Sequence, residues 1–258
     1  MDHAASRTTL LNHLLPVARR AGDVIMQIYR AEFAVALKAD ASPVTLADQA
    51  AEDVILAALT ALTPEIPIVA EEAFAAGHCP ECGQRFWLVD PLDGTREFIG
   101  RNGEFTVNIA LVEACTPVLG VIFAPALGSL YAGAVGVGSF VESGGIRSPI
   151  ACRKPPAEGL TVISSRSHAD QAALERFLQG RPVARSTTAG SSLKFGKLAA
   201  GEADCYPRFG RTMEWDIAAG HAIVAAAGGS VTDLQGVELT YAKPGFENPH
   251  FVAWGRRD

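Results

Sequence analysis

Residues 87–95, with the sequence WLVDPLDGT, constrain this chain more than any other stretch. The apolar residues at its start predict a buried strand, which ends at Asp90. Asp93 follows three positions later, and Gly94 and Thr95 then begin a new element. The stretch therefore brings two carboxylates, a main-chain carbonyl and a glycine turn into one small volume. Hard divalent cations bind such oxygen ligands, and phosphate binds the amides that glycine turns and helix starts expose.

The composition is that of a soluble globular protein. Hydrophobic residues make up 48% of the 258 residues and charged residues 19%, which excludes a disordered chain. The net charge of −6 argues against a nucleic-acid polymer as partner, because binding a phosphate backbone requires basic clusters. No run of about eighteen apolar residues occurs, so we expect no transmembrane segment.

The cysteines and the amino terminus indicate a compartment. Five scattered cysteines, an odd number, do not form a disulfide framework. The first residues lack the basic flank and apolar core of a signal peptide. We therefore expect a cytoplasmic protein, and the sequence leaves open a peripheral association with the inner membrane. It also leaves open whether the protein is a monomer or a homodimer.

The first part of the chain is expected to contain two long helices followed by a run of strands. Apolar residues recur at helical spacing over residues 8–30 and again over residues 45–61. Short apolar or alternating runs between turn residues predict strands at residues 66–69, 86–90, 105–113, 117–123, 130–135 and 137–141. The strands at residues 105–113, 117–123 and 130–135 are expected to form an antiparallel meander.

The pattern changes after residues 153–156, RKPP, which predict a hinge or linker. Strands are expected at residues 160–164, 183–187, 203–206 and 230–232, alternating with helices at residues 169–178, 191–200 and 215–227. This alternation predicts helices packed on a second sheet. We therefore expect an α+β protein whose residues 1–155 form a metal-binding domain. Residues 156–258 would form an α/β domain that completes the metal site and the substrate pocket.

Five acidic residues stand at the ends of apolar segments and are candidate metal ligands: Glu71, Glu72, Asp90, Asp93 and Asp216. Carboxylates are costly to gather in a small space unless a cation neutralises them. The alternative is that each is a surface or capping residue, and Asp216 in particular could cap the helix that follows it.

Asp48 and Thr95 form a second candidate pair. The sequence TLAD at residues 45–48 predicts a capping box, which makes Asp48 a helix-capping carboxylate. Alternatively, Asp48 accepts a proton from Thr95, whose hydroxyl would then orient and deprotonate a metal-bound water. The two roles are compatible, because a side chain in a first helical turn can still point into a cleft. Spacing alone favours the capping role.

Residues 190–194, GSSLK, place a glycine and two hydroxyls at a helix start, with a lysine one turn in. Amides at a helix start with a nearby cation suit a second phosphate. The alternative is an ordinary serine-capped helix.

Residues 78–83, HCPECG, are similar to one knuckle of a zinc ribbon. A structural zinc needs four ligands, and the other cysteines, Cys115, Cys152 and Cys205, are far apart in the sequence. We therefore expect a solvent-facing loop.

Together these motifs resemble the signature of the lithium-sensitive, magnesium-dependent phosphomonoesterases of the inositol monophosphatase superfamily. That signature consists of an aspartate, a Glu-Glu pair, Asp-Pro-[Ile/Leu]-Asp-[Gly/Ser]-Thr, and Trp-Asp followed by Gly-Gly. Its counterparts here are Asp48, Glu71 and Glu72, residues 90–95, Trp215 and Asp216, and Gly228 and Gly229. The resemblance covers essentially the whole chain and implies a layered α-β-α-β-α sandwich. Residues 78–83 are not part of the signature, which leaves the geometry of that loop open.

Within the superfamily, the bacterial 3'(2'),5'-bisphosphate nucleotidases are the more similar branch. The segments that carry this resemblance are residues 87–98, 101–110, 165–170, 190–195 and 206–210. It implies hydrolysis of the 3'-phosphate of adenosine 3',5'-bisphosphate to AMP and phosphate, with a small phosphorylated nucleotide as partner. The alternatives are an inositol monophosphatase or sugar phosphatase of the same superfamily and, outside it, a non-catalytic metal-binding or interaction protein.

The resemblance also implies a role for each matching residue. Two or three Mg²⁺ ions are expected. One would bind Glu71, Asp90 and the main-chain carbonyl of Leu92, and a second would bind Asp90, Asp93 and Asp216.

Thr95 with Asp48 would activate the attacking water, and the amides of Gly94 and Thr95 would hold the scissile phosphate. The nucleotide would be surrounded by His168, Ser191, Lys194, Arg208 and Asp216.

Overall fold

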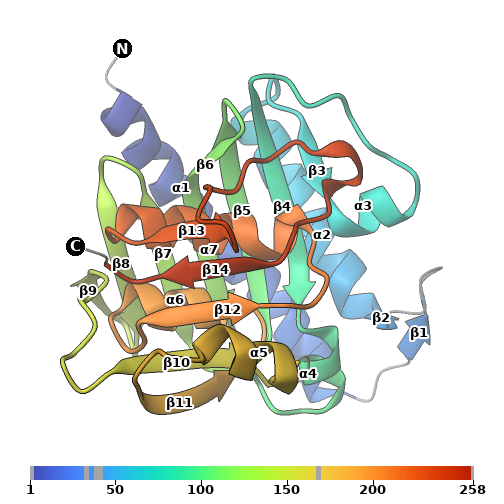
Figure 1. The fold of residues 1–258 in the computed structure, drawn as a ribbon. Helices are drawn as coiled ribbons and strands as arrows, with labels where there is room; N and C mark the ends of the chain where they lie inside the picture. The colour runs from blue at the N-terminus through green and yellow to red at the C-terminus, as the bar shows by residue number, and fades with distance from the viewer. Residues whose placement is uncertain (1–2, 32–34, 38–42, 167–169, 257–258) are drawn as a thin grey trace.

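Five layers of helices and sheets make up the protein in the computed structural model, which describes residues 3–31, 35–37, 43–166 and 170–256 (Figure 1). The layers are, in order, helices α1 (His3–Arg30) and α2 (Leu46–Leu62), a seven-stranded sheet, helices α6 (Leu193–Ala199) and α7 (Glu214–Ala226), a five-stranded sheet, and helix α5 (Gln171–Leu178). This is the α-β-α-β-α order expected from the sequence. No helix in the described part of the chain is long and apolar enough to cross a membrane.

The larger sheet is the predicted meander extended at both ends. Its strands, in spatial order, are β3 (Ile68–Ala70), β4 (Arg85–Asp93), β5 (Thr106–Glu113), β6 (Thr116–Ala124), β7 (Ser129–Ala134), β8 (Gly138–Ser143) and β9 (Ile146–Ile150). All neighbours are antiparallel except β3 and β4, which are parallel. Helices α1 and α2 pack on one face over a buried cluster that includes Leu14, Ile55 and Trp87.

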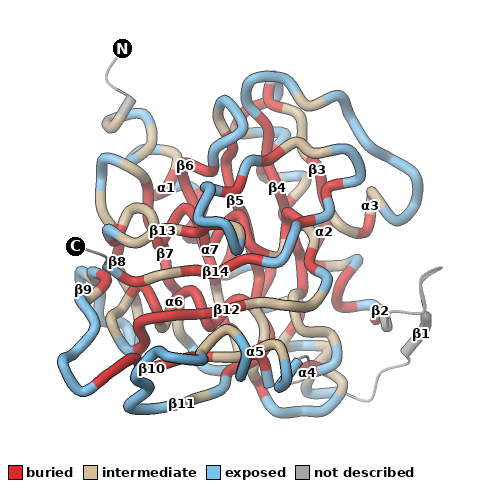
Figure 2. Tube along the Cα trace, in the orientation of Figure 1, coloured by how far each residue is buried: buried red, intermediate tan, exposed pale blue. Residues whose placement is uncertain are grey.

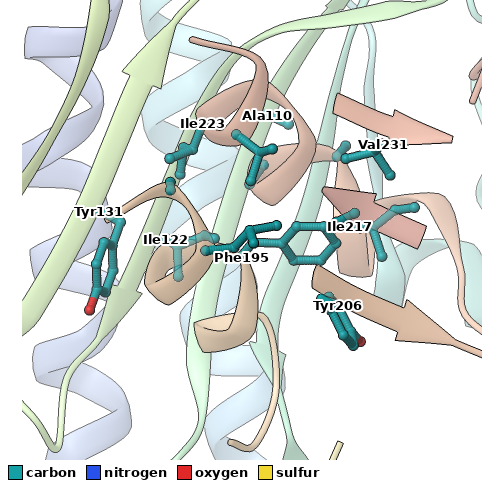
Figure 3. Close-up of a cluster of buried hydrophobic side chains, with 14 of the residues drawn as sticks. Ala110, Ile122, Tyr131, Phe195, Tyr206, Ile217, Ile223 and Val231 are labelled. Atoms are coloured by element: carbon teal, nitrogen blue, oxygen red, sulfur yellow. The ribbon is translucent and has the colours of Figure 1, made fainter. Parts of the chain in front are cut away.

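The other face of this sheet is covered by α7, in which every residue from Ile217 to Val224 is buried because the helix lies between the two sheets. The buried side chains from both sheets and from both central helices form one continuous cluster (Figure 3). Gly120 of β6 permits the close contact, since a Cβ there would lie 2.2 Å from the carbonyl oxygen of Ala219. This contact fixes α7, and therefore its first turn, against the strands.

The smaller sheet has the order β11 (Val183–Ala189), β10 (Leu160–Ser165), β12 (Cys205–Arg208), β14 (Phe251–Trp254), β13 (Ser230–Asp233). Strands β11, β10 and β12 are parallel, and β14 runs antiparallel to both of its neighbours. In Figure 2, β9 and most of β11 are exposed at the edges of their sheets, whereas the central strands are buried.

Several short elements were not expected. Helices α3 (Glu71–Ala75) and α4 (Thr95–Ile99) are one turn long, η1 (Pro244–Phe246) is a single 3-10 turn, and β1 (Val35–Leu37) pairs with β2 (Pro43–Thr45). The helix predicted at residues 191–200 begins two residues later, because Ser191 has a left-handed backbone with φ of 40°. The division into two domains at residue 155 stays a prediction.

Candidate metal and phosphate site

Three of the predicted metal ligands converge. Carboxylate oxygens of Glu71, Asp90 and Asp216 all lie within 4.8 Å of one another, and no other group of three such residues in the described ranges does so. The topology explains two of them: β3 and β4 are parallel and pair Ala70 with Val89, so Glu71 and Asp90 follow side by side. Asp216 is brought to them by the first turn of α7.

Asp93 joins this group through a β-bulge. Asp90 pairs with Asn108 and Asp93 with Thr106, so three steps along β4 match two steps along β5. Residues three apart on a regular strand point to opposite faces, and the extra residue of a bulge restores the same face. Pro91 suits this place because a bulge leaves one residue without ladder hydrogen bonds. The Asp90 carboxylate accepts a hydrogen bond from the amide of Leu92 at 3.0 Å, which closes the bulge.

The electrostatics of these carboxylates suit a bound cation. Burial, then repulsion from Asp93 and Glu71, raises the pKa of Asp216 well above its ordinary value. Burial likewise raises the pKa of Asp93 to about 6, against the attraction of Lys194. The side chain of Asp90 is 1% exposed. Buried like charges of this kind are stable when a divalent cation neutralises them, and an all-oxygen donor set is the one that Mg²⁺ binds.

Asp48 makes the hydrogen bonds that each of its two candidate roles requires. Its Oδ2 accepts the backbone amide of Thr45 at 2.7 Å, and the Thr45 hydroxyl accepts the amide of Ala47 at 3.1 Å, so the predicted capping box is present. Its Oδ1 accepts a hydrogen bond from the Thr95 hydroxyl at 3.2 Å. The same hydroxyl lies 3.4 Å from the carbonyl oxygen of Leu92, the predicted main-chain ligand.

Gly94 provides the turn that places Thr95 at the start of α4. Its φ of 89° is left-handed, and a Cβ would lie 3.1 Å from that of Ser191. Gly94 and Thr95 line a cavity of about 550 Å³ together with Glu71, Asp93 and Asp216. The cavity is thus lined both by carboxylates and by a glycine turn.

The residues predicted to hold a second phosphate line the same cavity. They are Ser191, Lys194 and Arg208. The ammonium of Lys194, whose side chain is 3% exposed, donates to the carbonyl oxygens of Ala189, at 3.3 Å, and Ser191. Burial lowers the pKa of Lys194 to about 8, against the attraction of Asp93. Arg208 donates to the carbonyl of Arg211 at 3.2 Å.

Two predicted features lie elsewhere. His168 is outside the described residues. In the cysteine loop, His78 and Cys79 face solvent as expected, whereas Cys82 is partly buried and packs against the core. Burial and the neighbouring Cys79 raise the pKa of the Cys82 thiol to about 11.

Three polar residues around the 190–194 segment were missed by the sequence reasoning. The carboxylate of Glu104 accepts a hydrogen bond from the backbone amide of Gly190 at 2.8 Å. It also accepts hydrogen bonds from Nε and Nη2 of Arg166, at 2.7 and 2.9 Å. Thr106 and Asn108 of β5 bond to the hydroxyls that follow Gly190. Residues 101–110 carry part of the family resemblance, and within them only a polar residue at alternate positions marks these three.

Comparison with known proteins decides the family. The model of the inositol monophosphatase family matches residues 6–254. The chain belongs to the inositol monophosphatase family. Members of this family are metal-dependent phosphatases that generally use Mg²⁺.

Proteins named 3'(2'),5'-bisphosphate nucleotidase CysQ are similar over nearly the full length. The protein from Escherichia coli strain K12 is 49% identical over 247 residues, which cover 94% of this chain and 98% of the relative. The Salmonella typhimurium protein is 50% identical with the same coverage. The crystal structure of CysQ from Bacteroides thetaiotaomicron superposes with a TM-score of 0.81 at 35% identity, covering 97% of this chain and 98% of that one.

Proposed function

We propose that this protein is a Mg²⁺-dependent phosphatase that hydrolyses the 3'-phosphate of adenosine 3',5'-bisphosphate to AMP and phosphate. The observation that carries the proposal is a single cavity lined by both acidic and basic side chains. Glu71, Asp93 and Asp216 line it with Thr95, which bonds to Asp48, and Lys194 and Arg208 line it too. A phosphomonoester with a second phosphate is the substrate class that uses both kinds of group. Full-length similarity to nucleotidases of this name supports the choice.

The carboxylates would hold two or three Mg²⁺ ions. Glu71, Asp90 and the carbonyl of Leu92 would bind one ion, and Asp90, Asp93 and Asp216 a second, so that Asp90 bridges. Bound Mg²⁺ neutralises phosphate charge and lowers the pKa of coordinated water. Asp216, close to Glu71 and Asp90, fits this set because its carboxylate is also fixed by the amide of Met213 at 2.8 Å.

The water that attacks phosphorus would be oriented by Thr95. The Thr95 hydroxyl donates to Asp48, so its oxygen lone pairs are directed toward the cavity and can accept a proton from water. Asp48 in turn is held in place by the amide of Thr45, and its other oxygen would accept the proton from Thr95. The amides of Gly94 and Thr95 would hold the scissile phosphate. The chain's own contribution is therefore positioning and electrostatics.

The basic side chains would select the substrate. Lys194 and Arg208, with the hydroxyl of Ser191, would bind the 5'-phosphate, and His168 would lie near the nucleotide. An inositol monophosphate has no second phosphate for these side chains. We further propose that the protein acts in the cytoplasm as a monomer or homodimer.

Phosphate release from a substrate panel tests the proposal. The panel contains adenosine 3',5'-bisphosphate, inositol 1-phosphate and fructose 1,6-bisphosphate, each with Mg²⁺ and with or without Li⁺. The highest kcat/KM is expected for the nucleotide, with inhibition by Li⁺. A preference for inositol 1-phosphate would replace the nucleotidase with the inositol monophosphatase alternative, and no release from any substrate would reject phosphatase activity.

A further inference from the structure

Asn108 is a buried polar residue for which the proposed mechanism has no use. It lies near the start of β5 with 1% of its surface exposed, directly opposite Asp90 of β4. Residues paired in this way on antiparallel strands project to the same face, with their Cβ atoms about 5 Å apart. Asn108 is therefore a neighbour of the carboxylate proposed to bridge two cations.

The amide of Asn108 is only half satisfied. Its Oδ1 accepts a hydrogen bond from the hydroxyl of Ser192 at 2.6 Å, whereas its Nδ2 has no hydrogen-bond partner among the described residues. Buried amide donors are nearly always paired, because leaving one unpaired costs free energy. Turning the amide over would satisfy the nitrogen but leave its oxygen without a donor beside a group of carboxylates. Nδ2 of Asn108 is therefore a buried donor whose hydrogen bond is not made within the described residues.

On its other side Asn108 is connected to the segment that would hold the second phosphate. The Ser192 hydroxyl bonds to Asn108 and, at 2.7 Å, to Thr106, whose hydroxyl also bonds to Ser191 at 2.9 Å. The backbone amide of Ser192 donates to the carboxylate of Asp93. A continuous set of buried hydrogen bonds therefore runs from residues 191–192 to the position beside Asp90.

We propose that Asn108 is a positioning residue whose Nδ2 donates to the carboxylate of Asp90 when divalent cations are bound. The inference rests on the proposed function, because it assigns Asp90 as a metal ligand. A carboxylate has several lone pairs, so Asp90 can accept further hydrogen bonds in addition to that of the Leu92 amide. Because Oδ1 of Asn108 bonds to Ser192, the Asn108 side chain would also fix the position of Asp90 relative to the segment that would bind the second phosphate.

The expected consequence is on metal affinity. Hydrogen bonds to ligating carboxylates fix their orientation, and their removal typically weakens metal binding by about 10- to 100-fold. Asn108→Leu removes the donor and keeps the site filled. Ser192 keeps its hydrogen bond to Thr106, so the substitution leaves no other buried hydroxyl without a partner.

Titration calorimetry with Mg²⁺ alone, on chelator-treated full-length protein, measures this effect without turnover. The Mg²⁺ dissociation constant of Asn108→Leu is expected to rise about 10- to 100-fold over wild type. Thr63→Val is the matched control: it removes a buried hydrogen bond, from Trp87 Nε1 at 2.9 Å, on the opposite face of the sheet. It should lower the melting temperature and leave the Mg²⁺ dissociation constant unchanged.

The two proposals fail in different ways. If wild type binds Mg²⁺ and folded Asn108→Leu binds it equally well, Asn108 has no positioning role, whereas the proposed function stands. If wild type binds no Mg²⁺ at millimolar concentration, the proposed function is rejected, and this inference with it. Circular dichroism checks the fold, and Asn108→Ala replaces the leucine variant if that does not fold. Equal loss of affinity in Thr63→Val would show a general effect of stability and would also overturn the inference.

Discussion

The carboxylate of Asp48 joins the start of α2 to the hydroxyl of Thr95. One oxygen accepts the amide of Thr45 at 2.7 Å, and the other accepts the Thr95 hydroxyl at 3.2 Å. A capping residue has a fixed rotamer, so the cap of α2 also fixes the acceptor for Thr95. The hydrogen bonds that cap the start of α2 therefore also position a residue of the proposed catalytic machinery.

Asp48→Asn should separate these two roles. The amide side chain retains an oxygen for a hydrogen bond but cannot accept a proton at neutral pH, so kcat should fall by about 100- to 10,000-fold. The melting temperature should fall only slightly. Asp53→Asn, on the exposed side of the same helix, is the control and should keep both the kcat and the melting temperature of wild type. A variant with near-normal kcat would show that Asp48 only caps the helix.

The pKa of Asp93 predicts how pH and Mg²⁺ act on stability. Because its folded pKa is raised to about 6, the metal-free native state binds more protons than the unfolded state between about pH 4 and 6. Stability of the metal-free protein should therefore fall as pH rises through this window. The raised pKa of Asp216 acts in the same direction.

Mg²⁺ should counteract this loss because it binds the ionised carboxylates. At a concentration of 100 times its dissociation constant it should add about 2.7 kcal/mol to the free energy of unfolding. The rise in melting temperature on adding Mg²⁺ should be larger at pH 7.5 than at pH 5, where protons compete. A rise that is equal at the two pH values would contradict the assignment of Asp93 and Asp216 as ligands.

Lys194→Ala should change substrate preference. Loss of the buried cation proposed to bind the second phosphate should lower kcat/KM for adenosine 3',5'-bisphosphate by about 10- to 100-fold, the usual range for hydrogen bonds to charged groups. Inositol 1-phosphate should lose much less. Lys197→Ala, on the same helix but paired with Glu202 at the surface, is the matched control. Equal losses on both substrates in Lys194→Ala would remove the structural reason for preferring a nucleotidase.

Much of the fold could be predicted because it is encoded locally. Helices α1 and α2 and the strands β5, β6 and β7 have periodic apolar residues that each segment carries by itself. Strand β14 was missed, since its four residues follow a long irregular segment and become a strand only by pairing with β12 and β13. Strand β9 was missed because it is a short exposed edge that contains Pro149.

The site was predictable in its residue types and only partly in its geometry. The motifs that resemble the family indicated Glu71, Asp90 and Asp216, and the structure brings these three together. The orientation of Asp93 depends on a bulge, which is a property of pairing between two strands and has no signal in one of them. Asn108 was missed for a similar reason: its importance follows from the residue opposite it.

We propose that the carboxylates around Asp90 bind the cations on which turnover depends. Phosphate release from adenosine 3',5'-bisphosphate by Asp90→Asn at millimolar Mg²⁺ tests it most directly. Asn keeps the side-chain oxygen that accepts the Leu92 amide, so the fold should survive. Asp204→Asn, a buried carboxylate bonded to Arg153 outside the cavity, should lose stability and keep its activity. We predict that Asp90→Asn loses about 1,000-fold or more in kcat with a native circular dichroism spectrum, and near-normal turnover by this variant would contradict the metal assignment.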